Sequence, residues 1–164
     1  MGERPGALAS FQESFNVLDR LAKSDPNHAE RQYDLAVARE RLAQLAVDDG
    51  KLDLALQMYR ENLASIVPIR DRDQSNVLFQ RSTRTAHNLI GEILVKQGKA
   101  DDALRSFESA LAIARKLAAD DPANVQSQQG VVEIAGNLAK ALETKGSLGD
   151  ALAYRREALA IVER

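Results

Sequence analysis

Paired aspartates are the residues in this sequence whose type and spacing come closest to a chemical site. They occur at positions 48–49, 101–102 and 120–121. Neighbouring carboxylates can bind calcium or act as general acid and base. None of the three pairs continues into the longer loop that calcium sites use, and no nucleophile is placed beside them. Each pair falls at a turn or at the end of an expected helix, so we interpret the pairs as structural.

Other reactive side chains are scarce. The sequence has no cysteine, which excludes disulfides, thiolate metal sites and a cysteine nucleophile. Its two histidines, His28 and His87, are too few for a multi-histidine metal site. We expect His28 to be exposed or to cap a helix, and His87 to pack against the following helix. No phosphate-binding loop or catalytic triad is present. The sequence therefore predicts no enzyme activity, no catalytic residue, no metal and no cofactor.

Composition points to a folded, helical chain. Hydrophobic residues make up 45% of the 164 residues and charged residues 28%, which is ordinary for a globular protein. Aromatic residues contribute only 4% and tryptophan is missing, so the core must be built from Leu, Ala, Ile and Val. This favours packed helices over a β-sandwich.

Charge and hydropathy exclude several partners. A formal net charge of −2 gives no electrostatic footprint for nucleic acid or an anionic membrane. No apolar run reaches the roughly 18 residues of a membrane span, and the N-terminus lacks the apolar core of a signal peptide. We therefore expect no nucleic acid, no membrane and a cytoplasmic location.

An internal repeat of 48 residues organises the chain. The dipeptide Ala-Leu begins at positions 7, 55, 103 and 151, each 48 residues after the last. A glycine precedes each pair by five residues, at positions 2, 50, 98 and 146. Aromatic residues keep the same register, as Phe11, Tyr59 and Phe107. Agreement between unrelated landmarks identifies a structural repeat.

Each repeat reads as two helices. Apolar residues recur at spacings of three and four from Leu104 to Leu117, and Pro122 then disfavours helix. Asn124 is a suitable N-cap for the next helix, which ends before Gly146. Transfer of this frame predicts seven helices, at about 5–24, 27–48, 52–72, 76–96, 100–119, 124–145 and 148–164. Short linkers make neighbouring helices antiparallel, and stacked copies bury a continuous core, as in a solenoid.

The stretch from Asn88 to Leu111 resembles a tetratricopeptide repeat (TPR). The landmark residues of that family's pattern occur in order as Ile90-Gly91, Leu94, Gly98, Ala103-Leu104, Phe107 and Ala110. The neighbouring repeats match less fully, because Asn62 replaces the alanine and Arg155 the aromatic residue. Tyr154, one place early, is expected to fill that aromatic slot or to leave it partly open.

The resemblance covers essentially the whole chain, but the repeat exceeds the common TPR length of about 34 residues. It resembles a long-helix bacterial TPR variant found in larger signalling or regulatory proteins. The resemblance implies an all-α, right-handed superhelical solenoid of antiparallel helix pairs. We expect one repeat domain over 1–164, with about three and a half repeats, as part of a longer array.

The resemblance also implies a concave groove lined by the first helix of each repeat. The family's groove positions fall here in columns at four-residue spacing. The protein-binding residues predicted in this way are Glu40, Gln44, Asp48, Asn88, Glu92, Lys96, Lys140 and Thr144, with Gly136 heading the third column. The alternative is a solvated face with an ordinary Glu92–Lys96 ion pair. Acidic residues in the groove disfavour a ligand held by its terminal carboxylate.

Two functions remain open at this point. The first is a non-catalytic scaffold that binds a peptide or partner helix in the concave groove, within a larger signalling or regulatory protein. The alternative is a structural, self-assembling repeat array whose stacking is the function. Phe11, Phe15 and Leu159 are expected to form exposed apolar faces on the terminal helices, and would favour a homo-oligomer.

Packing can be predicted as well. Six apolar residues are expected to be buried between helices: Phe107, Leu111, Ile90, Leu94, Leu138 and Leu142. Gly91 and Ala139 should let helices approach closely, opposite large residues. Pro68 lacks an N–H group and is expected to kink the third helix or to end it early.

Overall fold

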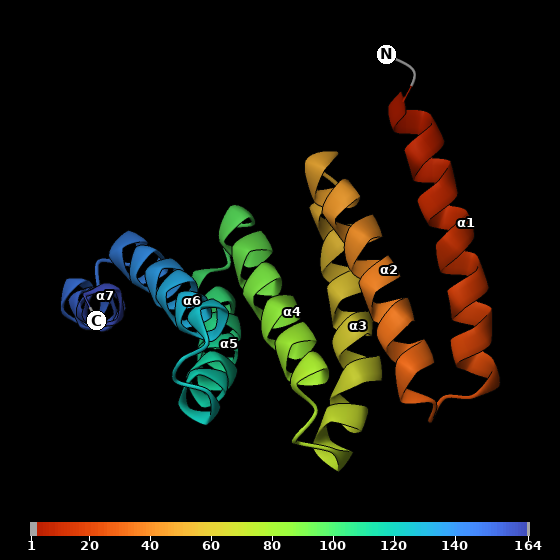
Figure 1. The fold of residues 1–164 in the computed structure, drawn as a ribbon. Coiled ribbons are helices and arrows are strands. Elements are labelled where there is room, and N and C mark those ends of the chain that lie inside the picture. Colours follow the sequence, from red (N-terminus) through yellow and green to blue (C-terminus); the bar gives the residue numbers. More distant parts are fainter. Residues whose placement is uncertain (1–2, 164) are drawn as a thin grey trace. The chain divides into compact units, whose positions relative to one another are not determined.

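A computed structural model describes residues 3–163, and side chains from residue 9 onward. Within that range the chain forms seven α-helices and no strand (Figure 1). The helices are α1 Glu3–Ser24, α2 Ala29–Asp48, α3 Leu52–Arg72, α4 Val77–Lys96, α5 Ala100–Asp120, α6 Val125–Thr144 and α7 Leu148–Val162. The all-α prediction is confirmed. Gly2 and the side chains of the first Ala-Leu pair lie outside the described residues.

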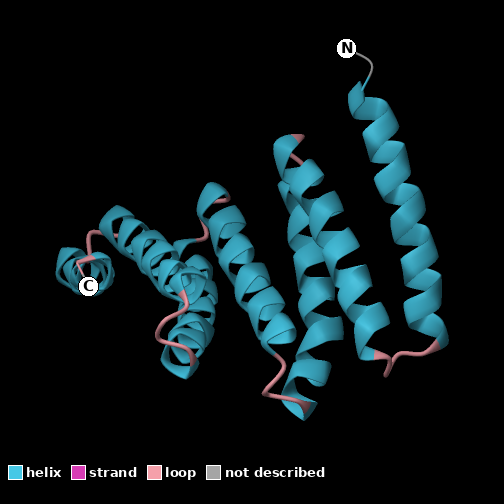
Figure 2. Ribbon diagram, in the orientation of Figure 1, coloured by secondary structure: helices cyan, strands magenta, loops and turns pink. Residues whose placement is uncertain are grey.

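Glycine turns connect the two helices of a repeat. Gly50, Gly98 and Gly146 have φ angles of 74°, 73° and 82°, in the left-handed region that favours glycine. The N–H group of the next residue then reaches back to the preceding helix, as in the Lys99 N–H to Leu94 carbonyl bond of 2.9 Å. This is the Schellman ending of a helix, and it explains why glycine recurs here. These turns are among the short loops in Figure 2.

The first helix of a repeat is capped at its N-terminus by the side chain of the residue that precedes it. Asn124 Oδ1 accepts a 3.0 Å hydrogen bond from the Ser127 N–H group, and Asn76 Oδ1 accepts one of 3.1 Å from the Leu78 N–H group. His28 fills the same place on α2, where Nδ1 accepts from the Arg31 N–H group at 3.4 Å. The capping roles predicted for Asn124 and His28 are confirmed.

The chain divides into two compact units, residues 1–82 and 83–164. The division falls inside α4. The single repeat domain and the right-handed superhelix stay predictions.

Unit 1 has a core built around α2, α3 and the first turn of α4. Ala36, Ile66 and Phe79 are buried together, and the Tyr33 ring meets Phe79 edge-on at a centroid distance of 5.9 Å. Asn62, in the place of the family's alanine, is buried as well. Its Nδ2 donates a 3.1 Å hydrogen bond to the Ala36 carbonyl, which holds α3 against α2.

Unit 2 has a core centred on Phe107, which is 1% exposed. A Cβ atom added at Gly91 would lie 2.5 Å from the Phe107 ring, so α4 and α5 approach too closely there for any side chain. Leu111, Ile90, Leu94 and Leu138 are also buried, as predicted. Leu142 is only half-buried, so the prediction for this residue is wrong; it lies in the last turn of α6, where the helix leaves the core.

Pro68 lies inside α3, which continues to Arg72. The expectation that the helix ends early is therefore wrong, and a kink stays a prediction. Proline leaves the carbonyl four residues earlier without its helical donor. That residue, Ala64, is exposed, as is Pro68, so water can satisfy the carbonyl and the helix continues.

Candidate protein-binding face

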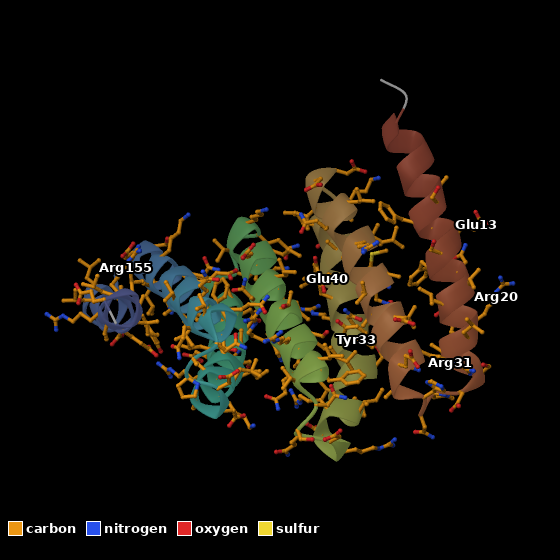
Figure 3. The ribbon with its side chains drawn as sticks, in the orientation of Figure 1. Glu13, Arg20, Arg31, Tyr33, Glu40 and Arg155 are labelled. Carbon is orange, nitrogen blue, oxygen red and sulfur yellow. The ribbon has the colours of Figure 1, made fainter. Side chains whose placement is uncertain are left out.

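The first predicted column runs along α2 in unit 1. Glu40 is half-buried, whereas Gln44 and Asp48 are exposed. Gln44 Nε2 donates a 3.1 Å hydrogen bond to Asp48 Oδ1. Burial raises the pKa of the Glu40 carboxyl group above its ordinary value, and the positive charge of Arg41 partly offsets this. Glu40 and Tyr33 are labelled on the ribbon in Figure 3.

The other two columns lie on α4 and α6 in unit 2. Asn88 is buried, Glu92 is half-buried and Lys96 is exposed. On α6, Lys140 and Thr144 are exposed. The second and third columns both belong to unit 2 and form one surface. The first column belongs to unit 1 and is a separate surface.

Four polar side chains join α4 to α6. Asn88 Nδ2 donates to Glu92 Oε1 at 2.9 Å and to Glu133 Oε1 at 3.2 Å. Asn137 Nδ2 donates to Asn88 Oδ1 at 3.1 Å and to Glu92 Oε1 at 3.3 Å. Two amides therefore hold two carboxylates beside one another across the two helices.

Glu133 and Asn137 are the members of this network that sequence reasoning missed. They lie outside the predicted column, in which Gly136 takes the place of Asn88. The residues of a helix that face a neighbouring helix differ from those that face solvent. Only the packing of α4 on α6 shows which residues of α6 face α4. The spacing of Glu133 and Asn137, four residues apart, was the available signal.

The network gives the surface a direction. Residues 88 and 92 of α4 pair with 133 and 137 of α6 in ascending order, so the two helices run the same way. Lys96 and Lys140 follow four and three residues after the network, toward the carboxyl ends of the helices. We call this surface the α4–α6 face: Asn88, Glu92, Lys96, Glu133, Asn137, Lys140 and Thr144. Its carboxylates precede its ammonium groups along both helices.

Ion pairs connect other parts of unit 2. Arg115 on α5 binds Glu157 on α7 through two hydrogen bonds of 2.7 and 2.6 Å, which raises the pKa of the guanidinium group. Arg155, labelled in Figure 3, pairs with Glu143 of α6 at 3.1 Å. Lys145 forms a hydrogen bond with Asp101 that lowers the pKa of this carboxyl group. These pairs join neighbouring helices at exposed edges.

Comparisons with known proteins agree with this geometry. A family model described as tetratricopeptide repeat matches residues 83–123, which contain most of α4 and all of α5. The crystal structure of BtubC (BKLC) from P. vanneervenii superposes with a TM-score of 0.69 at 26% identity, covering 96% of this chain and 56% of that one. Residues 83–123 thus match a TPR-type repeat, and the fold of the described chain resembles that of BtubC.

A second solved structure, MamA MSR-1 C2, is similar in fold. Its TM-score is 0.53 at 17% identity, and the match covers 94% of this chain and 69% of that chain. No curated protein matches the sequence. The chain spans a little over half the length of BtubC. Its fold is a helical-repeat solenoid, a class that generally serves as an interaction scaffold without catalytic function.

Among the described residues, no group of three or more His, Cys, Asp or Glu side chains could hold a metal ion. None of the helices described here is both long enough and apolar enough to cross a membrane. The half-buried position of His87 on α4 agrees with a packing role.

Proposed function

We propose that this protein is a non-catalytic scaffold and that its α4–α6 face binds a peptide or a partner helix. The observation that carries the proposal is the network in which Asn88 and Asn137 orient Glu92 and Glu133. Ordered carboxylates are efficient partners for Lys and Arg side chains, because less conformational entropy is lost when the pair forms. Glu40, Gln44 and Asp48 of α2 are proposed as a separate binding column in unit 1.

Spare hydrogen-bonding capacity supports a ligand at this network. A carboxylate offers about four acceptor sites. The amides of Asn88 and Asn137 occupy two of them at Glu92, both on Oε1. A cationic side chain of a ligand can therefore bind Glu92 without breaking the network.

The order of charges predicts how the ligand lies. Basic residues of the ligand should face Glu92 and Glu133, and acidic residues should face Lys96 and Lys140. A ligand bound in the reverse direction would place like charges together, which disfavours that orientation. The proposed ligand is thus a peptide with a basic and an acidic segment.

Charge reversal tests the proposal. A partner is first captured from the source cell with the chain as bait, and its affinity is then measured for purified variants. Glu92→Lys and Lys140→Glu should each weaken binding by about tenfold or more, as charge pairs across an interface do. Glu108 on α5 is exposed and lies outside the α4–α6 face, so Glu108→Lys is the matched control.

The control should bind as the wild type does, and circular dichroism should show the same helix content for all variants. If Glu92→Lys and Lys140→Glu bind a captured partner as tightly as Glu108→Lys does, the assignment of the face is wrong.

Exposed apolar residues on α7 favour self-assembly as the second candidate function. Leu148, Leu152 and Val162 are exposed, and Leu159 is 54% exposed although its repeat equivalent Leu111 is 1% exposed. Stacking of copies through this face would bury these side chains. Phe11 and Phe15 are half-buried, so α1 contributes less to such a face than expected. Sedimentation over a hundredfold range of concentration separates the two functions.

We also propose a cytoplasmic location. Support comes from the mildly acidic composition.

A further inference from the structure

One arrangement of three helices occurs in both units: the first helix of a repeat packs against two second helices. In unit 2, α6 packs against α5 and α7. In unit 1, two repeats earlier in the sequence, α2 packs against α1 and α3. We call these arrangements the α5–α7 joint and the α1–α3 joint. Each residue of one joint therefore has an equivalent in the other.

An exposed ion pair connects the two second helices of the α5–α7 joint. Arg115 on α5 donates to both carboxylate oxygens of Glu157 on α7, at 2.7 and 2.6 Å. The Arg115 side chain is 51% exposed. On α6, between these helices in the sequence, Ala135 is fully buried and carries no charge. The cation of this joint thus comes from a second helix and lies in contact with water.

The charges are exchanged in the α1–α3 joint. Asp19 and Glu61 stand at the repeat positions of the Arg115–Glu157 pair, and two acidic side chains cannot form an ion pair with each other. The cation is found on the first helix instead, because Arg39 on α2 stands at the repeat position of Ala135. Each joint therefore has one cation among these three positions, although the helix that supplies it differs.

Arg39 reaches both neighbouring second helices from a buried position. Its Nε lies 3.8 Å from Glu61 Oε2 on α3, and its Nη1 donates to Ser65 Oγ at 3.4 Å. Toward α1, the guanidinium carbon lies 5.7 Å from the centre of the Phe15 ring. Burial lowers the pKa of the guanidinium group, and the negative charges of Glu61 and Asp19 oppose this shift. The Arg39 side chain is only 9% exposed.

Dissolved salt should act differently on the two cations. At about 1 M salt the Debye length is about 3 Å, so exposed ion pairs are weakened, whereas buried ones are screened much less. Two exposed pairs hold α7, since Arg155 also binds Glu143 of α6 at 3.1 Å. Ala151 alone is buried among the residues of α7, which leaves these ion pairs a large share of what holds the helix.

We propose that the α5–α7 joint loosens as the ionic strength rises, and that Arg39 makes the α1–α3 joint resistant to salt. Arg39 is a positioning residue, which holds α1 against α2 and α3. The two joints give one chain an end that responds to salt and an end that does not. This inference rests on the helices themselves and does not depend on a ligand at the α4–α6 face.

Hydrogen exchange of the full chain, followed by mass spectrometry, measures both joints in one experiment. Amides of α7 should exchange about two- to fivefold faster in about 1 M than in about 0.05 M sodium chloride, the range expected of exposed ion pairs. Amides of α1 should change little between the two solutions. Exchange of α7 that does not depend on salt would overturn the proposal, as would an equal salt effect on α1.

Removal of the exposed cation tests its role in unit 2. Arg115→Ala should make α7 exchange faster at low salt and should reduce the effect of added salt. Lys116→Ala is the matched control, because Lys116 forms an exposed ion pair with Asp120 inside α5 and does not join two helices. The control should exchange as the wild type does. If α7 exchanges equally in the two variants, the proposal is wrong.

Transfer of the cation tests its role in unit 1. Arg39→Ala leaves Asp19 and Glu61 without their shared cation and should make α1 exchange faster. Asp19→Arg added to this variant rebuilds the arrangement of unit 2, in which an arginine of the second helix faces a glutamate. The double variant should regain slow exchange of α1 at low salt and lose it at high salt. Exchange of α1 as fast as in Arg39→Ala would overturn the proposal. Unfolding of the whole chain by Arg39→Ala would overturn it as well, because Arg39 would then be needed for the core.

Discussion

Phe11 in unit 1 and Phe107 in unit 2 occupy the same repeat position, yet they have different environments. Phe107 is sealed against Gly91 of α4. Phe11 is half-buried, and the guanidinium group of Arg41 lies over its ring. One aromatic residue therefore serves as a core residue in one unit and lines a hollow between α1 and α2 in the other. The comparison teaches that α1 and α5 are equivalent in sequence, but the burial of their aromatic residue depends on a first helix that packs against it.

Truncation of the two rings is expected to give the largest difference. Phe107→Ala should lower the free energy of unfolding by about 3–5 kcal/mol, the range for deletion of a buried aromatic side chain. Phe11→Ala should cost about 1 kcal/mol, because the half-buried ring loses less transfer free energy. Urea unfolding followed by circular dichroism measures both. Equal losses would show that Phe11 is covered in solution.

Substitution of glycine should have a smaller effect, with opposite signs at two positions. Gly91→Ala forces a methyl group against the Phe107 ring and should destabilise the protein by about 1–3 kcal/mol. A Cβ atom at Gly136, also inside a helix, meets nothing within 4 Å. Gly136→Ala should therefore stabilise the protein by about 0.5–1 kcal/mol through helix propensity. The same urea titration decides, and a gain in stability from Gly91→Ala would contradict the close packing of α4 on α5.

The smallest expected effects concern how stability depends on pH. The dependence should have opposite signs at Glu40 in unit 1 and at Asp101 in unit 2. Burial raises the pKa of Glu40, so the folded state binds more protons than the unfolded state, and its contribution to stability falls as the pH rises above ~4.3. The hydrogen bond from Lys145 lowers the pKa of Asp101, so its contribution is present above ~3.9 and is lost as the pH falls. The test is the difference in urea unfolding midpoint between wild type and each of Glu40→Gln and Asp101→Asn, measured at several pH values. The change of each difference with pH gives the sign of that residue's contribution. A midpoint difference that does not change with pH would contradict the assigned cause.

The helices and their turns could be predicted well from the sequence, because the signals are local. Gly98 must adopt a positive φ angle to end α4, and Asn124 caps α6 through its own side chain. Such requirements involve residues within one turn of helix, so a 48-residue period transfers them along the chain. Pro68 was the exception, since its exposed surroundings allow α3 to continue.

The candidate site could be predicted only in part. Asn88 and Glu92 follow from the four-residue columns, but their partners Glu133 and Asn137 lie off the predicted column. Leu142 matched the apolar stripe of α6 and is nevertheless half-buried. In each case the outcome depends on how far a neighbouring helix extends and which edge it presents, which periodicity within one helix does not report.

By itself, the sequence determined that this protein is a chain of paired helices with a 48-residue period, because turn glycines, caps and apolar stripes act over a few residues. Only the tertiary structure decided which members of the repeat are buried and which polar groups meet. Burial and hydrogen bonding between helices require a second surface at contact distance. Phe107 and the Asn88 network have such a surface in unit 2, whereas in unit 1 Phe11 and Arg41 line a hollow.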